Sequence, residues 1–152
     1  MTLYAYDQTF YQTGIRNLAG VDEVGRGPLA GDVYAAAVIL PPDFYDERIN
    51  DSKKLTEKKR EALYDVITAH AVAWNVASVS AQVIDEINIL QATFRAMREA
   101  VAGLIVPPEY VLVDGNGDPG ISCPHICVVK GDATSQAIAA ASIVAKVTRD
   151  RY

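Results

Sequence analysis

The sequence predicts a single α/β domain in which helices flank a mixed β-sheet. Three observations lead to this fold class. Short apolar segments end at glycine, proline or polar turns, as buried strands do. Longer segments repeat apolar residues at the spacing of an amphipathic helix. Three apolar strands followed by a helix, two strands and a helix indicate a mixed sheet covered by helices. A length of 152 residues suits one domain with its own core.

The first predicted elements are two strands and a helix. Leu18–Val24 is a short apolar segment that ends at the glycine-rich turn Gly25–Gly31. Val33–Leu40 is a second apolar strand, which two prolines stop. Thr56 is a suitable N-cap for a helix that begins at Glu57.

The later elements follow the same two patterns. We expect Trp74 to pack in the core and His70, at the end of the first helix, to be structural. The predicted elements are a strand over Ala71–Val79, one long helix from Ser80 or Ala81 to Leu104, strands over Tyr110–Asp114 and Ile126–Val129, and a final helix over Thr134–Arg151.

The composition indicates the cellular compartment but does not decide whether the protein binds nucleic acid. No stretch has the roughly 18 apolar residues that a membrane helix requires, and only two cysteines are present. We therefore expect a cytoplasmic protein that binds no membrane. A net charge of −5 argues against nucleic acid, but basic residues crowd the segments 53–60 and 130–151, and bound cations would change the local balance.

Four carboxylates stand at the ends or turns of predicted strands. Asp22 and Glu23 interrupt the first strand, Asp114 ends a later one, and Asp132 follows the last strand. Carboxylates on buried strands are usually paired or bind a metal. Strand ends can meet at one edge of a sheet, and ligands made only of oxygen suit Mg²⁺ or Mn²⁺. Two such ions are a common device for phosphodiester hydrolysis.

Two points about these acids stay open from the residues alone. Asp132 stands near a helix start, where aspartate is also a common cap. Glu23 points to the opposite side of the strand from Asp22, so only a local bend would bring both carboxylates to one site.

Several sequence blocks resemble type 2 ribonuclease H. They are AGVDEVGRGPLAG (Ala19–Gly31), DSKKL (Asp51–Leu55), VLVDG (Val111–Gly115) and KGD…AAASIVAKVTRDR (Lys130–Arg151). Their order and spacing agree with that family across nearly the whole chain. The resemblance implies a ribonuclease H-like fold with a five-stranded mixed sheet. It also implies that Asp22, Glu23, Asp114 and Asp132 form a catalytic, metal-binding quartet.

The resemblance further implies the substrate. The family cuts the RNA strand of RNA/DNA hybrids, and it cuts on the 5′ side of ribonucleotides embedded in duplex DNA. Main-chain atoms of Gly25 and Gly27 would contact the 2′-OH, and Arg26 a neighbouring phosphate, because glycine permits close approach of backbone to a ligand. Ser52 and Lys53 are similar to residues near the nucleic-acid backbone.

Weaker candidates for phosphate contacts are Ser135 and Lys146, in the last block. Lys58, Lys59 and Arg60 are instead typical of a solvated helix face.

Two rival interpretations fail on local grounds. Residues 25–30 fit a dinucleotide-binding fingerprint, but that motif opens a helix, whereas a β-branched strand follows here. Cys123 and Cys127 suggest zinc, but in an extended segment residues four apart are separated by about 13 Å. We expect both cysteines to be buried and unreactive.

The chain ends at Tyr152, directly after the last family block. Family members continue with further helices and a tyrosine that stacks on the target sugar. We therefore expect residues 1–152 to be one catalytic domain that lacks the family's C-terminal segment, and to be monomeric. The alternative is a catalytically weak fragment that binds metal and hybrid duplex.

Overall fold

A mixed five-stranded sheet lies at the centre of the computed structural model, which describes residues 1–25, 31–50 and 54–151. The predicted fold class is confirmed. The strands are β1 (Leu18–Val24), β2 (Val33–Ile39), β3 (Ala73–Val79), β4 (Tyr110–Asp114) and β5 (His125–Val128). The helices are α1 (Leu3–Tyr11), α2 (Glu57–His70), α3 (Ala81–Ile87), α4 (Ile89–Ala102), the 3₁₀ turn η2 (Gly131–Ala133) and α5 (Gln136–Arg151).

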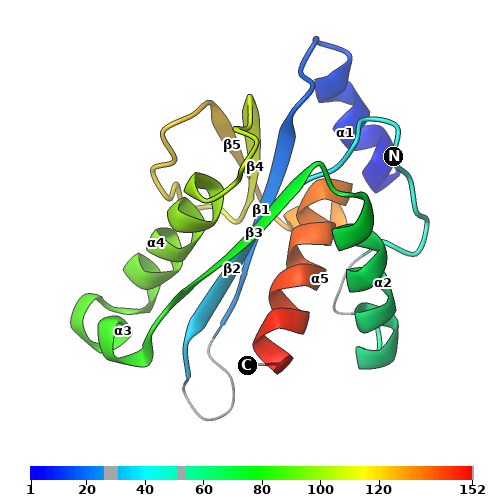
Figure 1. The fold of residues 1–152 in the computed structure, drawn as a ribbon. Coiled ribbons are helices and arrows are strands. Elements are labelled where there is room, and N and C mark those ends of the chain that lie inside the picture. Colours follow the sequence, from blue (N-terminus) through cyan, green and yellow to red (C-terminus); the bar gives the residue numbers. More distant parts are fainter. Residues whose placement is uncertain (26–30, 51–53, 152) are drawn as a thin grey trace.

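The strand order β3-β2-β1-β4-β5 places β1 at the middle of the sheet. β1 pairs with β2 antiparallel and with β4 parallel, and β5 continues the parallel half. Helices α3 and α4 cover one face, and α1, α2 and α5 cover the other (Figure 1). The C-terminal ends of β1, β4 and β5 therefore meet at one edge, where ligand sites of such sheets form.

Residue alternation along β1 divides the core between the two faces. Val21 belongs to the apolar cluster under α4, whereas Val24 belongs to the cluster under α2 and α5. Gly20 faces α5, and a Cβ atom at this position would overlap the backbone of Ala137 and Ile138. The missing side chain is what allows α5 to lie directly against the central strand.

The helix predicted from Ser80 or Ala81 to Leu104 is two helices, so that prediction was wrong. The break is at Asn88, whose φ of 73° no helix interior permits and whose side chain accepts a hydrogen bond from Gln91 N. Asparagine tolerates positive φ and is a good N-cap, so one residue ends α3 and starts α4. No helix among the described residues is both long and apolar enough to span a bilayer.

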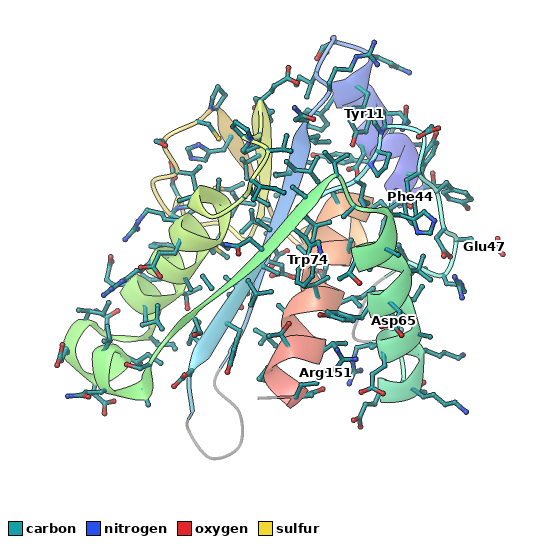
Figure 2. All side chains as sticks on the ribbon, viewed as in Figure 1. Tyr11, Phe44, Glu47, Asp65, Trp74 and Arg151 are labelled. Carbon is teal, nitrogen blue, oxygen red and sulfur yellow. The ribbon has the colours of Figure 1, made fainter. Side chains whose placement is uncertain are left out.

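One helix was missed, and one further prediction was wrong. The N-terminal helix α1 was not predicted, because its apolar and polar residues show little helical periodicity. Trp74 does not lie in the core: it is 38% exposed on the edge strand β3 (Figure 2). Its ring packs edge-on against Tyr64.

Candidate metal centre

Parallel pairing brings two of the acids together. The last paired residues of β1 and β4 are Val21 and Val113, so the residues that follow them, Asp22 and Asp114, come side by side on the face that carries α5. Glu23 joins them, and one carboxylate oxygen from each of the three residues lies within 4.8 Å of the other two. The three acids therefore offer a compact set of hard oxygen ligands.

Glu23 reaches this group without an interruption of β1. Its pairing with β2 continues through Asp22, Glu23 and Val24, so the ladder stays intact where both carboxylates reach one site. Glu23 lies past the last β1–β4 pair and its side chain is one methylene longer than that of aspartate. Its backbone N–H donates to Asp22 Oδ1 at 2.8 Å, which fixes the two residues relative to each other.

Repulsion is the main electrostatic feature of the group. Asp22 is only 4% exposed. Burial raises its pKa well above the usual range, and the charges of Asp114 and Glu23 and a hydrogen bond with the Asp114 carboxyl raise it further. Without a cation the group stabilises a proton on Asp22. A divalent cation would replace that proton, because it neutralises several carboxylates at once.

Asp132 is placed beside the group by a short 3₁₀ turn. It is buried in η2, directly after Gly131, whose backbone N–H donates to Asp114 Oδ1 at 2.7 Å. A Cβ atom at Gly131 would lie 3.0 Å from that oxygen and 2.6 Å from Ile138 Cδ1, so a larger residue would require these two side chains to shift. Asp132 thus lies one residue from a direct contact to Asp114, although it is outside the group of three.

Lys146 connects Asp132 to the same site. Burial lowers the pKa of its amine and the nearby Arg60 and Arg149 lower it further, while the charges of Asp22 and Asp132 act in the opposite direction. The Lys146 amine on α5 therefore interacts electrostatically with both Asp22 and Asp132. The oxygen-only ligands and their mutual repulsion fit Mg²⁺ or Mn²⁺.

The candidate substrate residues are only partly covered. Arg26, Gly27, Ser52 and Lys53 lie outside the described residues. Gly25 directly follows β1, and a Cβ atom added there would meet no atom of the described residues within 4 Å.

Ser135 and Arg60 differ from their predicted roles. Ser135 is fully buried and donates its hydroxyl to Asp7 Oδ1 at 2.6 Å, so it is not accessible to a phosphate. Arg60 is not on a solvated face: its guanidinium donates to Leu55 O at 2.7 Å and lies 3.8 Å from the Asp150 carboxylate. Lys58 and Lys59 are exposed, as predicted.

The cysteines form no metal site with the other described residues. Cys123 and Cys127 are free thiols, half-buried rather than fully buried, and pack against the core under α4. Burial raises the pKa of both thiols, which disfavours the reactive thiolate.

Comparisons with known proteins agree with this geometry. A family model described as ribonuclease HII matches residues 19–152. A ribonuclease HII from Bacillus mycoides is 57% identical over 146 residues, which are 96% of this chain and 56% of that protein. The chain thus spans little more than half the length of this relative.

Solved structures give the same relationship. The ribonuclease H2 from Pyrococcus horikoshii superposes with a TM-score of 0.78 and 30% identity, over 89% of this chain and 72% of that one. The RNase HII in a complex with PCNA from Archaeoglobus fulgidus has a TM-score of 0.69 and 29% identity, over 89% and 73% of the two chains. Sequence, fold and carboxylate geometry together establish that this chain belongs to the ribonuclease HII family.

Proposed function

We propose that the chain is a metal-dependent endonuclease that hydrolyses the RNA strand of RNA/DNA hybrids. The same site would cut on the 5′ side of a ribonucleotide embedded in duplex DNA and leave 3′-OH and 5′-phosphate ends. The observation that carries the proposal is the approach of Asp22, Glu23 and Asp114 within 4.8 Å at the edge where parallel strands end. Family membership supports the choice of substrate.

In this proposal Asp22, Glu23, Asp114 and Asp132 hold two Mg²⁺ or Mn²⁺ ions. Asp22 is the candidate for the shared ligand, because it stands at the middle strand and contacts both Asp114 and Glu23. When bound, such ions activate the attacking water and stabilise the charge on the leaving 3′ oxygen. Asp22 would lose its proton as the site fills, and Lys146 would hold a positive charge beside it.

Recognition of the ribose is assigned to the segment after β1. Gly25 directly follows the strand that carries Asp22 and Glu23, and its lack of a side chain permits its main chain to approach a 2′-OH. Arg26 and Gly27 complete this proposed reader, and Ser52 and Lys53 are the proposed phosphate contacts; these four residues lie outside the described part of the chain.

Substitution of Asp22 by asparagine tests the proposal. Asp22→Asn keeps the shape of the side chain but removes the shared charge, so we expect cleavage to fall by about 100-fold or more, the equivalent of several kcal/mol of barrier. The metal-free protein should be no less stable, since a buried, repelled carboxyl is removed. The assay uses duplex DNA with one ribonucleotide and either Mg²⁺ or Mn²⁺, with product ends identified on a denaturing gel.

Asp65→Asn is the matched control, because Asp65 is exposed on α2 and loses the same charge. It should cleave like the wild type. Wild-type rates in Asp22→Asn, or products with 2′,3′-cyclic ends, would contradict the metal mechanism.

The second candidate function is binding of metal and hybrid duplex without efficient cleavage. Little product in the cleavage assay together with Mn²⁺ binding that depends on Asp22 would favour this alternative.

Domain organisation, oligomeric state and compartment complete the proposed function. We propose that residues 1–152 act as one catalytic domain, as a monomer and in the cytoplasm. The two free thiols are compatible with a reducing compartment. Light scattering after size-exclusion chromatography measures the oligomeric state directly.

A further inference from the structure

A buried carboxylate on α1 holds the start of α5, close to the candidate metal centre. Asp7 is 2% exposed and accepts two hydrogen bonds from across the fold. Its Oδ1 accepts from Ser135 Oγ at 2.6 Å, and its Oδ2 accepts from Ala137 N at 2.9 Å. Ser135 Oγ in turn accepts from Ile138 N at 3.2 Å, so the first turn of α5 is tied to Asp7.

These contacts continue without a gap to the acids. Ser135 N donates to Gly131 O at 2.8 Å, and Gly131 N donates to Asp114 Oδ1 at 2.7 Å. Asp132 lies on the tight turn between Gly131 and Ser135. The orientation of the Asp132 carboxylate therefore depends on a turn whose two ends are held, at one end by Asp114 and at the other by Asp7.

The helix that carries Asp7 is itself firmly placed. Gln8 Nε2 donates to Pro42 O at 2.8 Å, and Phe10 packs against Tyr110 with ring centroids 5.7 Å apart. Tyr6 and Phe10 also cover the apolar cluster that contains Ile138 of α5. α1 can therefore act as a rigid support for the start of α5 (Figure 1).

We propose that Asp7 is a positioning residue for the metal centre: it orients Asp132 through Ser135 and the 131–135 turn. Asp7 precedes residues 19–152, the part that matches the family model. This inference rests on the proposed function, because Asp132 must bind a metal for its orientation to matter. Partners behind the direct ligands commonly change metal affinity by about 10–100-fold.

Mn²⁺ binding without substrate is the test, measured by calorimetry on the full chain. Asp7→Ala removes both acceptors, so α5 and the 131–135 turn can shift, and Mn²⁺ affinity should fall by about tenfold. Asp7→Asn carries the same charge as Asp7→Ala but can accept from Ala137 N and donate to Ser135 Oγ. It should recover most of the affinity. Asp65→Ala, which removes an exposed carboxylate, should bind like the wild type.

This pattern separates positioning from general stability. A purely structural Asp7 would lower the melting temperature of Asp7→Ala but leave the Mn²⁺ affinity of the folded protein unchanged, and that result would overturn the inference. Ser135→Ala keeps the bond from Ala137 N to Asp7, so it gives a second measurement if Asp7→Ala does not fold. Its affinity should fall by a smaller factor, and wild-type affinity would likewise overturn the inference.

Mn²⁺ binding by the wild type and by Asp22→Asn separates a failure of this inference from a failure of the proposed function. If the wild type binds Mn²⁺ and Asp22→Asn does not, the metal centre stands, and the Asp7 and Ser135 variants decide the inference alone. If the wild type does not bind Mn²⁺, the proposed function fails and the inference fails with it.

Discussion

Two buried aspartates in this fold show how partners decide the role of a carboxylate. Burial raises the pKa of both Asp7 and Asp22. Asp7 accepts from the Ser135 hydroxyl and the Ala137 amide, and these donors together with the Gln136 amide lower its pKa in part. Asp22 faces Asp114 and Glu23, whose charges raise its pKa further. Asp7 is thus satisfied by protein groups, whereas Asp22 requires a proton or a cation.

The pKa of Asp7 predicts a particular pH dependence of stability. Burial raises it from 3.8 to about 6 in the folded state. Between those pH values the folded protein holds a proton that the unfolded chain has released, so the free energy of unfolding falls as pH rises. The total effect is about 3 kcal/mol, at roughly 1.4 kcal/mol for each pKa unit, and it is complete above about pH 6.

Asp7→Asn removes this dependence. The stability of the variant relative to the wild type should therefore rise between about pH 4 and pH 6 and then level off. Urea unfolding in EDTA at several pH values measures the difference, in which the other titrating groups largely cancel. Parallel stability curves for the two proteins would show that Asp7 does not titrate in this range.

At the scale of elements, the contact between α5 and β1 fixes the site. Gly20→Ala puts a methyl group into the backbone of Ala137 and Ile138, which cannot move aside as a flexible side chain would. We expect a loss of about 3 kcal/mol or more in the free energy of unfolding, because overpacking against backbone strains both elements. Urea midpoints measure the loss.

Gly31→Ala is the control for this substitution. A Cβ atom at Gly31 would meet no atom of the described residues within 4 Å, so the same chemical change should alter stability by less than about 0.5 kcal/mol. Equal losses in both variants would mean that the lost glycine flexibility, rather than the helix contact, sets the cost.

The sequence predicts those elements whose residues carry a local pattern. Alternating or continuous apolar runs identified β1 and β4, and carboxylates at their ends pointed to the candidate site. The bond between Asp7 and Ser135 joins residues 128 positions apart, and no local pattern reports such a contact. The break at Asn88 was missed for a related reason, because helical apolar spacing continues across it.

At the scale of the whole molecule, basic residues gather on one side of the sheet although the net charge is negative. The chain carries a net charge of −5, yet Arg60, Lys146 and Arg149 lie together near the acids at the α2–α5 side of the sheet. The exposed Arg151 adds to this side, with its guanidinium 4.5 Å from the centroid of the Tyr64 ring (Figure 2). A nucleic-acid phosphate approaching this side meets attraction from these cations and repulsion from the carboxylates when they hold no cation.

Divalent cations should therefore control hybrid binding by this acidic chain. In EDTA, Asp114 and Glu23 repel phosphate, and one unit charge at 4 Å contributes about 1 kcal/mol even in water. We expect the affinity for an RNA/DNA hybrid to rise by at least about tenfold when Ca²⁺ replaces EDTA at constant ionic strength. Fluorescence anisotropy gives the affinity, and a gel verifies that the RNA strand is intact.

Asp22→Asn provides the internal comparison for that effect. Because Asp22 of the wild type holds a proton in EDTA, the variant should bind the hybrid about as tightly as the wild type there. It should gain less from Ca²⁺, because it lacks the proposed shared ligand. The slope of log affinity against log salt reports the counterions that phosphate contacts release. Among the described residues Arg60, Lys146, Arg149 and Arg151 would contribute about four. Equal affinity with and without Ca²⁺ in the wild type would place the hybrid away from the carboxylates and contradict the proposed site.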